Sequence, residues 1–331
     1  MRFPEFTEEW REYAIGNVLS IGNGRDYKHL HNGDIPVFGT GGYMTSVDDF
    51  LYDGESVFIG RKGTINKPLY YNGKFWTVDT LFYTHSFVNV LPKFAYCLFQ
   101  TINWLKYNEA SGVPSLSKAT IEKIKVRIPS MDEQDKLSNQ LFLLDKRIEV
   151  QNKIIEKYES LIKGIIEKTF VSTQYVPLQH YSPIITSGKD KDERGNYPLY
   201  GSTGVIGSVS KPSYNKSIVL IARVGSIGNV QYVTTPCGIS DNTLIIDAGE
   251  ENRFIYYYLN GYNFSHIISG TTQPLITASS VKKIKIPVIE KHRRKKIVST
   301  LCAIERKLYN ERQITYLLSR QKDFLLSQMF I

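Results

Sequence analysis

The stretch Ile35-Pro36-Val37-Phe38-Gly39-Thr40-Gly41-Gly42 decides the fold, because it returns 162 positions later as Tyr197-Pro198-Leu199-Tyr200-Gly201-Ser202-Thr203-Gly204. Four more pairs follow in the same order: Phe58 to Ile65 with Leu220 to Ile227, Asp79 to Leu81 with Asp241 to Leu244, Ser111 to Leu116 with Ser269 to Ile276, and Ile124 to Pro129 with Ile284 to Pro287. The offset between matching residues varies only from 162 to 158. In the match of Asp79 to Leu81 with Asp241 to Leu244, one residue of slippage follows the aspartate. Matches in one order at a nearly constant offset predict two similar domains.

Bulk composition agrees with two globular domains and leaves the partner open. The 331 residues are long enough for two domains of ordinary size, and 42% of them are hydrophobic. Lys and Arg number 41 against 32 Asp and Glu, which gives a formal charge of +9. This charge favours an anionic partner, although a solvated basic surface accounts for it equally well.

Three scattered cysteines, Cys97, Cys237 and Cys302, form no CxxC pair. This spacing predicts neither a structural zinc site nor a disulfide framework, and it is typical of a reducing compartment. The charged start of the chain does not resemble a signal peptide, and no apolar run reaches the length of a membrane span. We therefore expect a soluble, cytoplasmic protein.

Each copy begins with a region rich in glycine, aromatic and β-branched residues, which predicts short strands and tight turns. Val57 to Ile59 and Ile218 to Ile221 are expected to be buried strands, each running into a glycine-containing turn. Apolar and charged residues alternate from Ile124 to Ile128, which predicts a strand with one wet face that ends at Pro129. With the helices described next, the fold class is α/β, in the sense of mixed α+β.

A long helix is expected after each globular part. Ser130 and Glu133 fit a capping box at the start of the first helix. Seam positions, apolar with few exceptions, then step by four and three at Leu137, Leu141, Leu144, Ile148, Gln151, Ile155, Tyr158, Ile162 and Ile165, and in the second copy at Ile297, Leu301, Ile304, Leu308, Glu311, Thr315 and Leu318. At 1.5 Å per residue, each helix of roughly 38 residues would reach about 57 Å.

Neither helix can bury its apolar stripe alone, so we expect the two to pair as an antiparallel coiled coil. The alternative is that each helix packs only on its own domain. Gln151 and Glu311 occupy equivalent seam positions and either fix the register or lie near solvent. The expected division of the chain is 1–129 and 172–288 for two recognition domains, with 130–171 and 289–331 for the two helices.

The order of the repeated motifs resembles one family over nearly the whole chain. Pro36 to Gly42, Ile59 to Ile65, Asp79 to Phe82, Ser111 to Ser117 and Ile128 to Gln134 look like the target-recognition domains of type I restriction–modification specificity subunits. The ending Gln328-Met329-Phe330 is similar to the helix ending of that family. The second copy departs from the pattern at Ala222, Val224 and Lys291-His292, so the resemblance defines its contacts less closely.

The resemblance implies a subunit that binds double-stranded DNA and recruits two methyltransferase subunits and two restriction subunits. It implies two mixed α/β recognition domains joined by an antiparallel helical pair. S-adenosylmethionine, ATP and magnesium would belong to the partners, so no cofactor, no metal and no membrane contact is expected for this chain. Because the two copies differ in sequence, the two half-sites should differ as well, and the target should be asymmetric and interrupted.

The chain's own motifs agree that catalysis lies elsewhere. It has no Asn-Pro-Pro-Tyr and no GxxxxGK[ST] phosphate loop. Glu305 and Lys307 have the Glu-x-Lys spacing of many nucleases, but they lie within the heptad helix. A freestanding nuclease or methyltransferase is therefore the weakest alternative, behind a repeat scaffold that binds another polymer, such as a glycan, or a protein.

Several residues are candidates for contact with DNA. The glycine-rich loops suit phosphate contacts through their backbone amides, or they are simply tight turns. Arg61, Lys62 and Arg223 follow buried strands and would grip a phosphate or a guanine, unless the arginines pair with Asp79 and Asp241. The candidates in these loops and in the unlike segments 23–32 and 187–196 are Lys28, His29, Thr40, Gly41, Tyr43, Lys189, Lys191, Arg194, Ser202 and Thr203. For any one of the charged loop residues, plain solvation is the alternative.

Six basic or histidine residues, Lys291 to Lys296, stand at the start of the second helix. Cations there oppose the helix dipole, which favours negative charge at this end. We therefore expect Arg293, Arg294 and Lys295 to meet an external anion, either the DNA backbone or an acidic patch on a partner, with a solvated face as the alternative.

Overall fold

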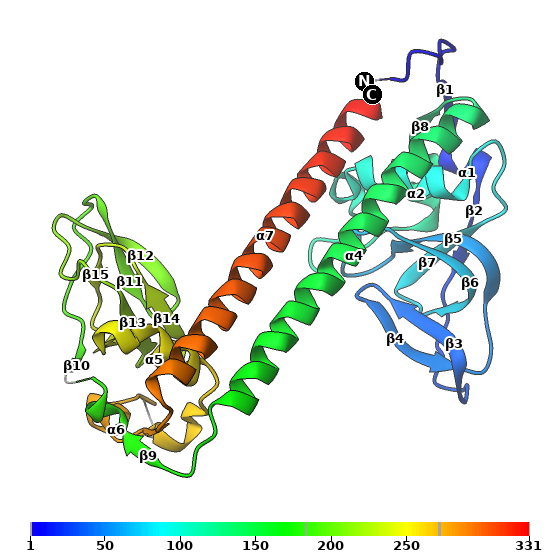
Figure 1. The fold of residues 1–331 in the computed structure, drawn as a ribbon. Helices are drawn as coiled ribbons and strands as arrows, with labels where there is room; N and C mark the ends of the chain where they lie inside the picture. Colours follow the sequence, from blue (N-terminus) through cyan, green and yellow to red (C-terminus); the bar gives the residue numbers. More distant parts are fainter. Residues whose placement is uncertain (1, 183, 271–272, 331) are drawn as a thin grey trace. The chain divides into compact units, whose positions relative to one another are not determined.

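The computed structural model describes residues 2–182, 184–270 and 273–330, which divide into two compact units (Figure 1). The first unit comprises residues 1–152 and 313–331, and the second comprises 153–312. The long helices α4 (Met131–Thr169) and α7 (Lys291–Met329) are each shared between the units. Each unit therefore holds a globular part, the beginning of one helix and the end of the other, whereas the division expected from the sequence separates helices from globular parts.

The globular part of the first unit is built on a six-stranded sheet. Its elements are β1 (Arg11–Ala14), α1 (Ile15–Val18), β2 (Ser20–Asn23), β3 (Asn32–Gly39), β4 (Gly42–Val47), β5 (Tyr52–Gly60), β6 (Leu69–Thr77), β7 (Leu81–His85), α2 (Pro92–Thr101), η1 (Trp104–Tyr107), α3 (Lys118–Lys123) and β8 (Lys125–Ile128). The strand order is β2-β7-β5-β6-β3-β4, and β1 pairs with β8 in a separate ribbon. Only the β3–β6 pairing in this sheet is parallel.

The second unit repeats this plan with a broken sheet. Its elements are β9 (Tyr175–Pro177), η2 (Leu178–His180), β10 (Ile184–Ser187), β11 (Tyr197–Gly201), β12 (Gly204–Val209), β13 (Ile218–Ala222), β14 (Val230–Val233), β15 (Gly238–Ile239), β16 (Thr243–Asp247), η3 (Gly249–Glu251), α5 (Asn252–Asn260), η4 (Phe264–Ile267), α6 (Ala278–Lys282) and β17 (Lys285–Pro287). The orders β10-β16-β13-β14 and β12-β11-β15 together reproduce the first sheet, with β14 and β15 in place of β6. Pro236 stands at the position of Lys74 in β6, and a proline cannot donate to the ladder.

The strand register corrects one detail of the repeat. Gly60 pairs with Leu81, and Ala222 pairs with Thr243, so both pairs keep the offset of 162. The N–H of Arg61 donates to the carbonyl of Thr80, and that of Arg223 donates to Asn242. The expected slippage after the aspartate is therefore wrong, and the two arginine loops are equivalent residue by residue.

The strands predicted to be buried form the centre of each core. Val57 and Ile59 of β5 are 0% and 1% exposed, and Ile218 to Ile221 of β13 are all 0% exposed. In β8, the predicted alternation is confirmed, since Val126 and Ile128 are buried while Lys125 and Arg127 are exposed. The ends of β5 and β13, where the arginine loops begin, are thus fixed by packed cores.

In each unit the two long helices lie together and against that unit's core. Leu137 and Leu141 of α4 share the first core with Leu325, Leu326 and Met329 of α7, and Lys322 bonds Asp145 across the pair. Ile166 of α4 shares the second core with Ile297 and Leu301 of α7, and Arg312 bonds Glu159. The beginning of one helix is therefore beside the end of the other, which confirms the antiparallel pairing and shows that each helix also packs on its domain.

The expected capping box at the start of α4 is wrong. Glu133 is 0% exposed, and its carboxylate accepts hydrogen bonds from Arg2 at 2.7 and 2.6 Å and from Trp10 at 3.3 Å. The glutamate therefore anchors the N-terminal segment to the helix. In the second unit, Glu305 of α7 accepts from Arg253 and Tyr257 of α5, both at 2.7 Å, so the glutamate of the Glu-x-Lys spacing serves helix packing.

The three cysteines are free thiols in unlike surroundings. Cys97 and Cys237 are buried, while Cys302 is half-buried and accepts a hydrogen bond from Tyr257 at 3.4 Å. Burial raises the pKa of Cys97 to about 12 and that of Cys237 to about 11. Because only the thiolate reacts, these two thiols are protected at ordinary pH.

We expect an aromatic disulfide reagent at pH 8 to modify Cys302 alone in the native chain, and all three cysteines after unfolding in guanidinium. Mass spectrometry of peptides locates the modified residues. Rapid labelling of Cys97 or Cys237 without denaturant would contradict the burial described here.

In the part of the chain that the structure describes, no helix combines the length and the apolar character that crossing a membrane requires.

Candidate nucleic-acid interface

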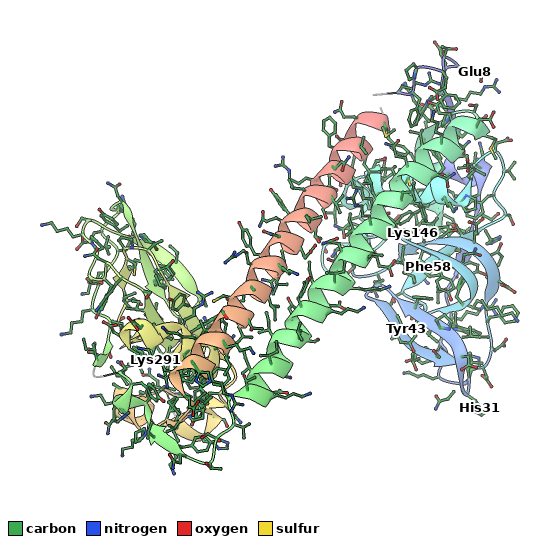
Figure 2. The ribbon with its side chains drawn as sticks, viewed as in Figure 1. Glu8, His31, Tyr43, Phe58, Lys146 and Lys291 are labelled. Atoms are coloured by element: carbon green, nitrogen blue, oxygen red, sulfur yellow. The ribbon has the colours of Figure 1, made fainter. Side chains whose placement is uncertain are left out.

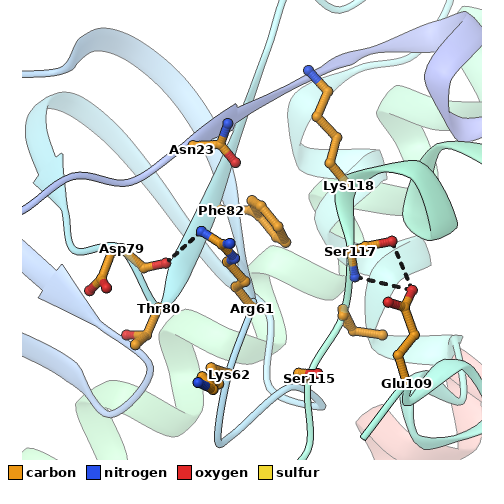
Figure 3. A pocket seen from close by; sticks show the side chains of 11 residues that line it. Asn23, Arg61, Lys62, Asp79, Thr80, Phe82, Glu109, Ser115, Ser117 and Lys118 are labelled. Carbon is orange, nitrogen blue, oxygen red and sulfur yellow. Dashed lines mark hydrogen bonds between the residues drawn. The ribbon is translucent and has the colours of Figure 1, made fainter.

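The loop after β5 opens a polar pocket in the first unit. The N–H of Arg61 donates to the carbonyl of Thr80, and the carbonyl of Arg61 accepts from the N–H of Leu116 at 2.9 Å. Backbone hydrogen bonds therefore hold the start of the loop on both sides. The pocket has a volume of about 460 Å³. It is lined by Asn23, Arg61, Lys62, Asp79, Thr80, Phe82, Glu109, Ser115, Leu116, Ser117 and Lys118 (Figure 3).

Two predicted cations of this pocket remain available to a ligand. The guanidinium of Arg61 lies over the ring of Phe82 at 5.7 Å and donates to the backbone carbonyl of Asp79 at 3.4 Å. Among the described residues, neither Arg61 nor Lys62 forms an ion pair, so the alternative pairing of Arg61 with the Asp79 carboxylate is not formed. Both side chains are exposed at the end of a rigid strand.

The start of α3 supplies the opposite wall of the pocket. Ser117 caps this helix and also donates to the carboxylate of Glu109 at 2.8 Å. Hydrogen bonds from the hydroxyls of Thr120 and Ser117 hold the pKa of Glu109 below its usual range. The pocket thus offers cations, hydroxyls and a fixed carboxylate. Sequence reasoning missed Glu109, Ser117 and Lys118, and the cap pattern of Ser117 and Thr120 was the available signal.

The glycine-rich loop is the turn of the β3–β4 hairpin, and it borders the Arg61 loop. Thr40 and Gly41 form a two-residue turn between the paired Gly39 and Gly42. Gly42 has a φ of 105°, which favours glycine. A β-carbon on Gly63 would lie 3.8 Å from the hydroxyl of Thr40. The tight-turn interpretation is confirmed, and the structure brings the predicted turn and arginine loop together.

The second unit repeats this geometry with other side chains. Ser202 and Thr203 form the turn, and a β-carbon on Gly225 would lie 3.3 Å from the hydroxyl of Ser202. Arg223 donates to the Ser187 hydroxyl at 3.1 Å, and its buried Nε has no hydrogen-bond partner in the described chain. No ion pair with Asp241 forms within these residues. Val224 and Ala278 replace Lys62 and Lys118, so this site carries fewer cations.

Lys28 and His29 lie far along the first hairpin from its turn. The ring of His29 meets that of Trp76 edge-on at 5.8 Å. The N–H of His31 donates to Asp48, which directly follows the last residue of β4. Tyr43 lies at the other end of that strand, beside the turn (Figure 2). The structure therefore separates Lys28 and His29 from the pocket, whereas Asn23, at the start of the same segment, lines it.

Carboxylates hold the corresponding loop of the second unit in place. Asp190 accepts from the N–H of Ile239 and the hydroxyl of Ser213, both at 2.7 Å. Asp192 accepts from the N–H of Ser208 at 2.9 Å, and such backbone hydrogen bonds lower its pKa. Lys189 is exposed and follows Ser187, the partner of Arg223, by two residues. Arg194 and Lys191 are exposed, and Arg194 lies toward the far end of β12, with a φ of 52°.

The basic start of α7 is partly neutralised from within the unit. Arg294 forms a two-pronged ion pair with Glu251 at 2.7 and 2.9 Å, and Lys291 lies 3.7 Å from Glu250. The expected external partner is thus replaced, for Arg294, by an acidic residue of η3. Arg293 and Lys295 are exposed and form no ion pair with a described residue, so their external contacts stay a prediction.

Nothing in this interface resembles a metal centre. In residues 2–182, 184–270 and 273–330, no three His, Cys, Asp or Glu side chains gather in a way that would hold a metal ion.

Solved structures share the fold of this chain. A crystal structure of the S subunit of a type I restriction–modification system from M. genitalium has a TM-score of 0.77 and 18% identity, covering 99% of this chain and 97% of that one. A structure from work on the complex assembly and conformational transition of the type I R-M system has a TM-score of 0.56 and 14% identity, covering 98% of each chain.

Sequence comparison identifies the family. A Haemophilus influenzae protein named as a putative type I restriction enzyme specificity subunit is 27% identical over 100 residues, which are 28% of this chain and only 26% of that protein. The family model described as "Type I restriction modification DNA specificity domain" matches residues 7–160 and again 181–318. These two matches fall on the two halves of the internal repeat, and the chain belongs to the family of type I restriction–modification DNA specificity domains.

Proposed function

We propose that this chain is the non-catalytic DNA-recognition subunit of a type I restriction–modification enzyme and that each unit recognises one half of an asymmetric, interrupted site. One observation carries the proposal: a hairpin turn beside an arginine loop is built twice on the same scaffold with different side chains. Lys62 and Val224 differ at equivalent positions, as do Tyr43 and Val205. Equal scaffolds with unlike contact residues suit two unlike half-sites.

The proposed partners are double-stranded DNA, two methyltransferase subunits and two restriction subunits. S-adenosylmethionine, ATP and magnesium would act in those partners, in the cytoplasm. Support comes from the family membership and from the relative solved in work on complex assembly of the type I R-M system. The net charge of +9 suits a phosphate backbone.

Binding measured over a range of salt concentrations tests the DNA-binding part of this proposal. The affinity of the full chain for duplex DNA should fall steeply as salt rises, because each phosphate contact releases counterions. An affinity for DNA that does not depend on salt concentration, or a preference for a neutral glycan over DNA, would favour the repeat-scaffold alternative instead.

Helix length should set the gap between the half-sites. Insertion of four residues into α4 near Gln151 and four into α7 near Glu311 adds about 6 Å of helix. The spacer of the recognised sequence should then lengthen by about two base pairs, because successive base pairs lie about 3.4 Å apart. Methylation mapping with the lengthened chain measures the spacer, and an unchanged spacer with retained methylation would refute this role of the helices.

A further inference from the structure

Two neighbouring apolar side chains are exposed at the start of the hairpin's second strand in each unit. In the first unit, Tyr43 is 64% exposed and Met44 is 51% exposed. In the second unit, Val205 is 60% exposed and Ile206 is 51% exposed. The two pairs are 162 positions apart, so they occupy equivalent places. Large apolar side chains that stay in water at the same place in both copies contribute little to either core, which points to a binding role.

The backbone of each hairpin is shaped to expose both members of the pair. Consecutive residues of a regular strand point to opposite faces, but both hairpins shift register at the same place, after Val37 and after Leu199. A β-carbon on Gly39 would lie 2.6 Å from the sulfur of Met44, and one on Gly201 would lie 2.7 Å from Ile206. The glycines therefore leave the room that the second apolar side chain occupies.

Each apolar pair stands beside a cationic loop. Thr40 lies next to Gly63 and hence to the Arg61–Lys62 loop, and Ser202 lies next to Gly225 and hence to the Arg223 loop. Tyr43 lies near the turn of its hairpin (Figure 2), and its hydroxyl is 3.1 Å from that of Ser46 on the same strand. An apolar tip flanked by cations is complementary to duplex DNA, in which charged phosphates border the apolar surfaces of the bases.

We propose that the tip pairs, Tyr43–Met44 and Val205–Ile206, contact the apolar surfaces of bases in the two half-sites and help to determine which bases each unit accepts. This inference rests on the proposed function and adds specificity-determining residues to it. An aromatic ring with a thioether and two β-branched side chains differ in shape, so they suit different bases. The surface contacted is either a thymine methyl group or the face of a base at a partly unstacked step.

The test uses the full chain with its co-purifying partners, on a duplex that carries the mapped recognition sequence and on a scrambled duplex. Tyr43→Ser/Met44→Ser and Val205→Ser/Ile206→Ser should each lower the affinity for the recognised duplex about 10- to 100-fold. Binding to the scrambled duplex and the salt dependence should not change, because the cations remain. Leu105→Ser is the matched control, since Leu105 is 56% exposed on η1, outside the hairpin.

Two modified duplexes separate the possible base surfaces. Uracil in place of thymine should reproduce the reduced affinity for a tip that contacts a methyl group. If the tip unstacks a base, the fluorescence of a 2-aminopurine placed at the contacted step should rise when the wild type binds. It should not rise when the tip variant binds.

The inference is overturned if the tip variants retain specific affinity, if they lose scrambled and specific binding alike, or if they keep specificity but lose a co-purifying protein. A wild-type chain with no salt-dependent DNA binding would instead refute the proposed function, and this inference with it.

Discussion

Replacement of Arg61 by alanine and of Lys62 by valine is expected to weaken binding of the full chain to duplex DNA about 10- to 100-fold at roughly 0.1 M salt. The two side chains are exposed at the end of β5 and form no ion pair with a described residue, so their charges are available to phosphates. For each phosphate that is no longer neutralised, the slope of log affinity against log salt should also become shallower by about 0.9. Titrations at several salt concentrations measure both quantities.

Two control variants make this expectation specific. Lys106→Ala removes an exposed cation of η1, outside the sheet, that forms no ion pair with a described residue, and should leave the salt slope unchanged. Val224→Lys gives the second unit the lysine that the first unit has at the equivalent position, Lys62, and should steepen the slope of log affinity against log salt by about 0.9. An Arg61→Ala/Lys62→Val chain that binds like the wild type would show that this loop does not touch DNA. A lower thermal stability would instead indicate a structural role.

The second large effect is expected at Lys322, near the end of α7. Its ammonium bonds Asp145 of α4 at 2.5 Å and Gln100 of α2 at 2.7 Å, and its side chain is only 12% exposed. The Oδ2 atom of Asp145 is already buried without a hydrogen-bond partner among the described residues. Lys322→Met would also remove the cation that pairs with this carboxylate. The free energy of unfolding should fall by about 1–3 kcal/mol, because the pair is partly buried and its loss leaves a carboxylate without its hydrogen-bond donor. Urea denaturation of the full chain measures the decrease.

The double variant Lys322→Met/Asp145→Leu tests the cause. With no charge left to bury, it should recover most of the stability that Lys322→Met loses. If the double variant is instead as unstable as the sum of the two single variants, the lysine contributes through packing alone. Equal stability of Lys322→Met and the wild type would show that the ion pair does not stabilise the fold.

Much of the fold follows from local pattern. The repeat predicted two copies of one plan, and the heptads predicted two long paired helices that the structure places at Met131–Thr169 and Lys291–Met329. The buried strand before Arg61 and the end of β8 before Pro129 were predicted as well. These features are set by residues within a few positions of one another, so the sequence displays them directly.

The errors concern partners that are distant in sequence. Glu133 fits a capping box locally, yet its carboxylate bonds Arg2, 131 positions away. Arg294 opposes the dipole of its own helix, yet Glu251, 43 positions away, neutralises it. No periodicity encodes such pairings, because tertiary packing brings the side chains together and decides which charge each one meets.

The candidate site was predicted in part. The hairpin turn and the arginine loop were identified separately, and the fold places Thr40 beside the Arg61 loop. The opposite wall, with Glu109 and Lys118, flanks the repeated motif Ser111 to Ser117, whose part in the site was not predicted. The exposure of Met44 and Ile206 depends on a register shift that alternation along a strand does not predict.

A map of adenine methylation across the genome of the source strain, with and without this gene, tests the central claim most directly. If the chain is the DNA-recognition subunit, methylation should disappear from one asymmetric motif with two unlike halves and a fixed spacer, and from no other motif. An unchanged map in a strain that produces the methyltransferase subunits, or the disappearance of methylation from a short uninterrupted palindrome, would contradict it.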